Sequence, residues 1–180
     1  GIETLKETVG RILGEPAQIS LVKDIKKYVS QFDGVEGAYD LILHNYGPDN
    51  YMASIHVAVK DTVNASEFDE MTRCIQKSVY EKFGIYITSV GMYAVNTTDA
   101  DAIAIREQIE ALVTEVEYVH QMHGFYINKA RKEMSFDIVV GFGTKDRHGV
   151  FENAVKMVKE KYPDYEINAN MDSDFNELED

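Results

Sequence analysis

One series of predicted elements, in the order helix, strand, strand, helix, strand, occurs twice along this chain of 180 residues. Apolar residues at helical spacing predict the helices, and alternating or apolar runs between turn formers predict the strands. The first series comprises helices over 22–32 and 65–83 and strands over 35–44, 51–60 and 85–93. The second comprises helices over 101–117 and 150–161 and strands over 119–128, 133–142 and 165–171. This order predicts two α+β units, each an open antiparallel sheet with two helices on one face.

The two series keep a common register, which indicates an internal duplication. Val119 lies 84 positions after Val35, Ser135 lies 81 after Ser54, and Tyr162 lies 79 after Phe83. The offset shrinks only at the hairpin turn and at the loop before the last helix, where changes of length are tolerated. The alternative is one mixed α+β domain whose halves are alike by chance.

We place the boundary between the two units within 96–99, a short polar stretch. The chain then divides into a first unit over 18–96 and a second unit over 97–180. Residues 1–17 precede both units as a lead-in helix, predicted over 2–13, and a linker.

Residues 44–61 predict the clearest hairpin of the chain. Turn formers crowd 45–50, and after them Ile55, Val57 and Val59 alternate with more polar or smaller side chains. Successive side chains of a strand point to opposite faces of the sheet, so His56 is expected on the face away from the core.

Composition narrows the classes of function. The formal net charge is −13, which disfavours nucleic acid as a partner because phosphate backbones are bound mainly through clustered Lys and Arg. The single cysteine, Cys74, excludes an internal disulfide and fits a reducing compartment; we expect it to pack beside an apolar helix stripe. No apolar run approaches the ~18 residues that span a bilayer, so this portion is expected to be soluble.

Several short motifs of the first unit occur in an order typical of a known family. They are ILGE at 12–15, GAYDL at 37–41, HNYGP at 44–48, SIHV at 54–57 and FGI at 83–85. Together they resemble the C-terminal cytoplasmic domain of bacterial cation diffusion facilitator (cation efflux) transporters. The resemblance implies a ferredoxin-like fold that dimerises below a membrane transporter, binds the transported divalent metal and biases the transporter's conformation. The second unit resembles a further copy, chiefly through the internal register.

The metal ligands of the family match the first unit only in part. The family pattern has a ligand before the Asp-Leu of the first strand, a His within the second strand and a His-x-Asp pair at the end of the third. Here Tyr39 replaces the first ligand, His56 keeps the second, and Gly91-Met92-Tyr93 replaces the third motif. His44, in the HNYGP turn, also matches a family His.

The second unit matches the ligand pattern better. His123 falls at the first position, Asp137 at the second and Asp172 at the end of the third motif. The resemblance therefore implies a metal site made of these three residues, with a fourth position filled by water, by His120 or by a partner subunit.

The residue types suit a divalent first-row ion. One imidazole with two carboxylates is an oxygen-rich set that would bind Zn²⁺ or Mn²⁺, and also Fe²⁺. A competing interpretation treats the histidines as polar surface residues and Asp172 as the start of a solvated acidic tail over 174–180.

We expect no catalysis, because the sequence has no Gly-rich loop between a strand and a helix that could hold a phosphate, and Cys74, beside an apolar helix stripe, is expected to be a packed thiol and not a nucleophile. The resulting hypothesis is a regulatory domain of a divalent cation efflux transporter, at the cytoplasmic face of the membrane. We expect a homodimer, linked covalently to a transmembrane domain in the full-length protein. The alternatives are a tandem module that binds a small molecule and a dimerisation scaffold without metal.

Overall fold

A computed structural model describes residues 16–47 and 50–172 of the chain. The helix predicted over 2–13 and the acidic tail over 174–180 lie outside the described residues. Within the described ranges, no helix is both long and apolar enough to cross a membrane.

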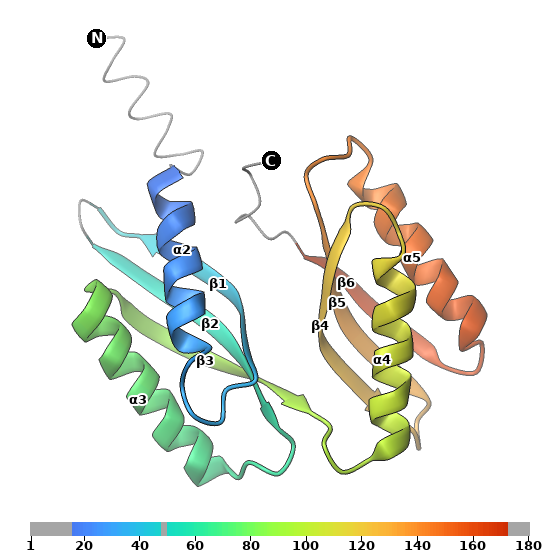
Figure 1. Ribbon diagram of the computed structural model, residues 1–180, viewed down its shortest axis with the longest axis horizontal. Helices are drawn as coiled ribbons and strands as arrows, with labels where there is room; N and C mark the ends of the chain where they lie inside the picture. Colours follow the sequence, from blue (N-terminus) through green and yellow to red (C-terminus); the bar gives the residue numbers. More distant parts are fainter. Residues whose placement is uncertain (1–15, 48–49, 173–180) are drawn as a thin grey trace.

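The helix, strand, strand, helix, strand order is present twice, as the sequence predicts (Figure 1). The first unit consists of α2 (Pro16–Val29), β1 (Gly37–Asn45), β2 (Tyr51–Lys60), α3 (Ala65–Phe83) and β3 (Tyr86–Val95). The second consists of α4 (Ala100–Thr114), β4 (Val119–Asn128), β5 (Glu133–Val140), α5 (Arg147–Lys161) and β6 (Glu166–Asp172). Each unit has its own three-stranded sheet, which confirms an α+β fold of two tandem ferredoxin-like αββαβ units.

Each sheet packs its helices on one face and holds a separate hydrophobic core there. In the first unit, Ile25 and Val29 of α2 and Ile75 and Val79 of α3 are fully buried against the strands. The second core has the same plan and is centred on Phe136 of β5. Two cores of this kind are expected when each sheet covers only one of its faces with helices.

The sheets are mixed, whereas the sequence-based prediction was antiparallel. β1 pairs with β2 and β4 with β5 in antiparallel hairpins, but β3 runs parallel to β2 and β6 parallel to β5. The reason is the helix between the last two strands, because α3 and α5 each carry the chain back along the sheet before the next strand begins.

Both hairpins contain a β-bulge at the same place. The pairing shifts between Tyr39 and Ile42 in β1, and between His123 and Tyr126 in β4. In each bulge one residue has positive φ: Asp40 at 50° and Gly124 at 63°. These bulges lie where the helix-free faces of the two sheets come into contact, so they set the direction of the side chains between the units.

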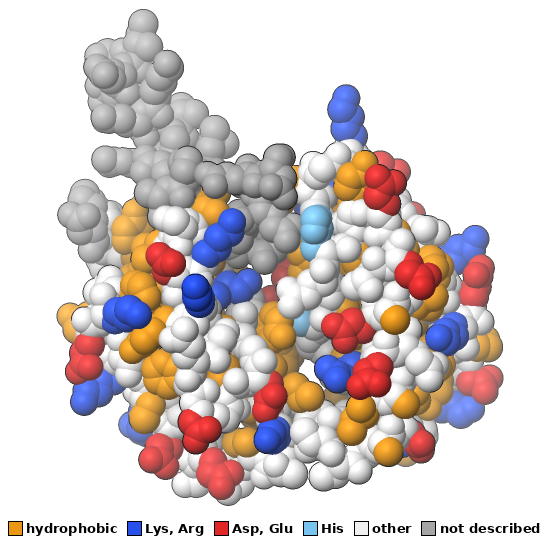
Figure 2. Space-filling view, in the orientation of Figure 1, with side chains coloured by type: hydrophobic (Ala, Val, Ile, Leu, Met, Phe, Trp, Pro, Cys, Tyr) orange, Lys and Arg blue, Asp and Glu red, His pale blue; other side chains and the backbone are white. Residues whose placement is uncertain are grey.

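Charged side chains are distributed over the outside of both units. On the face in Figure 2, Lys and Arg are interspersed with Asp and Glu.

Cys74 is exposed on α3, and the expectation that it packs beside the apolar stripe is wrong. The buried stripe of this helix passes through the neighbouring Ile75 instead.

Candidate metal centre

The second unit brings together the three residues that the sequence analysis selected. His123 of β4 pairs directly with Asp137 of β5, and β6 adds Asp172 two residues beyond the partner of Asp137. His123 Nε2 lies 3.6 Å from Asp172 Oδ2 and 4.0 Å from Asp137 Oδ2. The His123 side chain is 3% exposed, so it is not the polar surface residue of the competing interpretation.

A fourth acidic residue, missed by the sequence analysis, comes from the other unit. Asp40 Oδ1 lies 3.0 Å from His123 Nε2, across the contact between the sheets. Asp40 belongs to the Asp-Leu pair that was used only to locate a ligand before it. In the internal register Asp40 corresponds to Gly124 of the second unit, which has no side chain. Comparing the two units therefore did not mark Asp40 as a ligand, and only the packing of the units reveals its place in the site.

Three of these side chains form a compact set of ligand atoms. One atom each from Asp40, His123 and Asp172 lies within 4.8 Å of the other two. Ligands bound at about 2.0 to 2.2 Å from a tetrahedral ion are roughly 3.4 Å apart, so small side-chain movements would bring these atoms to bonding distance. The donor set, one imidazole and two carboxylates, therefore fits a divalent ion.

A tyrosine hydroxyl connects the acidic residues of the two units. Tyr93 Oη lies 2.6 Å from Asp40 Oδ2 and 3.1 Å from Asp137 Oδ2, and is shared between these two acceptors. The other oxygen of Asp137 accepts a hydrogen bond of 2.8 Å from the Asn170 amide. These contacts hold both carboxylates in place beside His123.

Aromatic rings enclose the site. The Tyr39 ring stacks on His123 with centroids 4.9 Å apart and planes at 9°, and His56 stacks on Tyr93 at 4.8 Å. His56 Nδ1 lies 3.2 Å from Asp40 Oδ2, at an angle that makes no hydrogen bond, and its side chain is 43% exposed. His56 therefore lies at the rim, as its predicted place on the helix-free face requires.

The contacts of Asp40 favour the ionised form of its carboxylate, which is the form that binds a cation. Burial works to raise the pKa of Asp40, but hydrogen bonds from His123 and Tyr93 outweigh it and hold the pKa well below the usual range. Burial, and then the hydrogen bond and charge of Asp40, raise the pKa of Tyr93. At neutral pH the site therefore contains an ionised carboxylate beside a neutral phenol.

Two of the predicted residues lie apart from this set. His44 is exposed near the end of β1, with Nε2 3.5 Å from Ser54 Oγ. His120 is also exposed, and its ring lies against Gly141 at the end of β5. Their role as ligands stays a prediction without support from the geometry.

A small cavity of about 100 Å³ adjoins the site between the units. Tyr39, Tyr93 and His123 line it together with Arg106 and Glu110 of α4. His123 Nδ1 has no hydrogen-bond partner among the described residues. In metal sites the second ring nitrogen of a ligating His commonly donates to a water, carbonyl or carboxylate, and this cavity is large enough for water.

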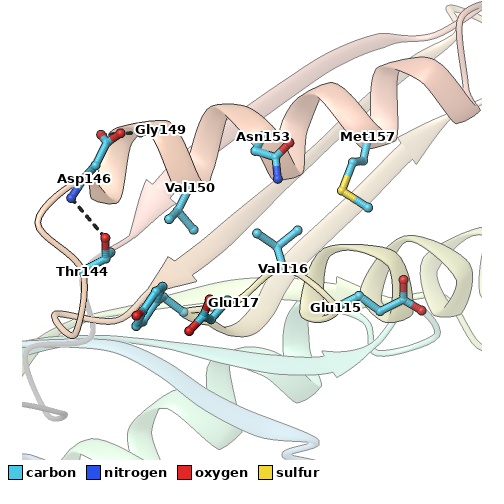
Figure 3. Close-up of a pocket in the computed structure, with 10 residues that line it drawn as sticks. Glu115, Val116, Glu117, Thr144, Asp146, Gly149, Val150, Asn153 and Met157 are labelled. Atoms are coloured by element: carbon cyan, nitrogen blue, oxygen red, sulfur yellow. Dashed lines mark hydrogen bonds between the residues drawn. The ribbon is translucent and has the colours of Figure 1, made fainter.

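The largest hollow among those described lies elsewhere, in the second unit between the end of α4 and the start of α5 (Figure 3). It is open and has a volume of about 620 Å³. Glu115, Glu117 and Asp146 line it, but the Asp146 carboxylate accepts from Gly149 N and caps α5. No histidine lines it, so this hollow does not provide the ligand set found between the units.

Comparison with known proteins gives one family match. Residues 20–90 match the family model described as the cation efflux protein, cytoplasmic domain. The matched segment runs from α2 into β3, so it covers the first unit and does not extend into the second. No curated protein sequence matches the chain.

Solved structures similar to the chain include several forms of the MamM CTD. One MamM CTD variant is 20% identical over 45% of this chain and 98% of that chain, with a TM-score of 0.37. The MamM CTD copper form is 11% identical over 51% of this chain and 99% of that chain, with a TM-score of 0.36. The periplasmic domain of the T3SS inner membrane protein PrgH from S. typhimurium is 10% identical over 85% of this chain and 70% of that chain, with a TM-score of 0.27.

Proposed function

We propose that this chain is the cytoplasmic regulatory part of a divalent cation efflux transporter, with a site for metal ions between the two units. The observation that carries the proposal is the set of ligand atoms from Asp40, His123 and Asp172, all within 4.8 Å of one another. Asp137, 4.0 Å from His123, is the fourth candidate ligand. The family match of residues 20–90 supports the transporter assignment.

The ion would act by joining the units. Asp40 belongs to β1, whereas His123 and Asp172 belong to β4 and β6, so the ion has ligands from both sheets. A ligand shifts a conformational equilibrium only by its different affinity for the two states. An ion bound in this way favours the arrangement in which the sheets approach each other, and this change would be passed on to the transporter.

The identity of the ion is part of the proposal. Two or three carboxylates with one imidazole form an oxygen-rich set, which suits Mn²⁺ or Fe²⁺ as well as Zn²⁺. We name Zn²⁺ and Mn²⁺ as the ions to test first.

The wider context is also proposed. Residues 1–17 would link the first unit, 18–96, to a transmembrane domain, and 97–180 would form the second unit at the cytoplasmic face of the membrane. We keep the homodimer as a prediction. Because the helix-free sheet faces already meet within one chain, a second chain would attach through another surface; sedimentation equilibrium should give twice the mass of one chain.

Calorimetric titration of the metal-stripped protein with Zn²⁺ and Mn²⁺ tests the proposal. We expect saturable binding that His123→Ala weakens by at least about 100-fold, since loss of mere supporting residues around a metal already costs about 10- to 100-fold. The matched control is His148→Ala. His148 is exposed on α5, where it pairs with Glu152, so its removal should leave affinity unchanged.

The same titration separates the alternatives. Equal binding by wild type and His123→Ala would move the site to His44, His56 or the acidic tail. Absence of binding by both ions would leave the dimerisation scaffold; the hydrogen bond of Tyr93 to Asp137 joins the two units of the chain without an ion. A module that binds a small molecule between the units has less support, since the cavity there, about 100 Å³, is smaller than the roughly 300 to 1,000 Å³ of most ligand pockets.

A further inference from the structure

The two units present equivalent strand positions to each other, but with different residues. Tyr39 in β1 pairs with β2 just before the bulge, and His123 in β4 pairs with β5 just before the same bulge. Gly124 therefore stands where the first unit has Asp40. A pair of identical units would place two equivalent sets of side chains between the sheets.

The last strands show the same correspondence. Tyr93 of β3 pairs with Ala58 of β2, and Asp172 of β6 pairs with Val139 of β5. Ala58 and Val139 lie 81 positions apart, which is the offset of the second strands. Tyr93 therefore occupies the position that belongs to Asp172 in the second unit.

We infer that the chain binds one ion and not two, because the equivalent site lacks an imidazole or carboxylate at three of its four positions and keeps only His56, the counterpart of Asp137. Each ligand of the candidate site has a counterpart at the equivalent position of the other unit. The counterparts of Asp40, His123 and Asp172 are Gly124, Tyr39 and Tyr93. Gly124 has no side chain, and the two tyrosines contribute neutral phenols instead of an imidazole and a carboxylate. This inference rests on the proposed function and fixes its stoichiometry.

The substituted residues also fill the space of the second site. Tyr39 stacks on His123, and Tyr93 Oη is shared between Asp40 Oδ2 and Asp137 Oδ2. A Cβ atom at Gly124 would lie 2.9 Å from Asp137 Oδ2 and 2.9 Å from the Tyr93 ring. These side chains are thus fitted to one another in the space that a second ion would occupy.

Native mass spectrometry of the intact chain, titrated with Zn²⁺ and then with Mn²⁺, measures the number of ions directly. We expect one ion per chain at saturation. Two tightly bound ions would overturn the inference and leave the proposed function standing. Absence of any bound ion would remove the proposed function and the inference with it, so the two failures are distinguishable.

A symmetrising variant gives a second test. Tyr39→His, Tyr93→Asp and Gly124→Asp together recreate the ligand set in the other half, and Asp40 shows that Asp tolerates positive φ at this bulge. A variant that folds, as judged by circular dichroism, should bind two ions; one ion would count against the inference. Tyr80→Phe, at an exposed tyrosine of α3, is the control and should keep the wild-type count. If the triple variant does not fold, the wild-type count still decides.

Discussion

Asp40 is the residue through which the first unit enters the candidate site. Its Oδ1 lies 3.0 Å from His123 Nε2, and its Oδ2 lies 2.6 Å from Tyr93 Oη. Both contacts stabilise the ionised carboxylate, which explains a pKa below the usual range in spite of burial. The same charge that stabilises the folded chain is therefore available to a cation.

The first prediction at this scale concerns pH. Asp40→Asn should lower the free energy of unfolding at pH 7 by about 1.5 to 3 kcal/mol, the usual contribution of a hydrogen bond to a charged group. The folded-state pKa lies below the unfolded one, so this stabilisation is present above pH ~4 and is lost as the pH falls further.

Urea unfolding of ion-free wild type and Asp40→Asn between pH 3 and 7 measures this effect. The difference between the two proteins should be largest at neutral pH and should shrink below pH ~4. A difference that grows on acidification would contradict the assignment of an ionised Asp40.

At the scale of elements, the paired β-bulges are the feature that aims side chains between the units. In both hairpins the bulge places one residue at positive φ, Asp40 in β1 and Gly124 in β4. The extra residue turns the strand locally, so that the side chain just before it, Tyr39 or His123, faces the other sheet. In a regular strand, consecutive side chains such as those of Tyr39 and Asp40 would point to opposite faces of the sheet, so only one of them would face the other unit.

Gly124→Ala tests this element against a matched glycine. Gly84, the C-cap of α3, likewise has a positive φ, of 70°, but apart from its chain neighbours no atom of the described residues lies within 4 Å of a Cβ placed there. Gly84→Ala should cost about 1 to 2 kcal/mol of unfolding free energy, the strain of a left-handed alanine.

Gly124→Ala should cost more, about 2 to 4 kcal/mol, because the new methyl group also meets Asp137 and Tyr93. Chemical denaturation of the two variants gives both values. Equal losses for the two variants would show that the contact between the units is not held as closely as these distances indicate.

At the scale of the whole molecule, the chain pairs two sheets within itself. Their helix-free faces meet through side chains of β1 and β3 on one side and of β4 and β5 on the other. Two identical chains paired in this way would form equivalent sites, whereas one chain can give each unit a separate role. Here the first unit supplies Asp40 and the tyrosines, and the second supplies His123, Asp137 and Asp172.

Sequence reasoning predicted the elements of this molecule well, because apolar periodicity reports on local burial. The clearest case is His56, placed on the helix-free face by alternation with Ile55 and Val57. His123, Asp137 and Asp172 were selected through the family resemblance, and the structure places them side by side on β4, β5 and β6.

The remaining features depend on information that one chain's local pattern does not contain. Asp40 reaches His123 only because the units pack face to face, and the sequence left that packing open. The parallel pairing of β3 depends on the direction in which α3 crosses the sheet. Cys74 is exposed although it directly precedes the buried Ile75, because adjacent helix positions point in directions about 100° apart.

The most direct test of the account is an anomalous diffraction map from crystals of the chain grown with Zn²⁺, measured at the zinc absorption edge. We predict one peak between the two sheets, about 2.0 to 2.2 Å from His123 Nε2 and from carboxylate oxygens of Asp40 and Asp172. A peak only at His44, only at the exposed His120, or no peak between the sheets at saturating Zn²⁺ would contradict a metal centre shared by the two units.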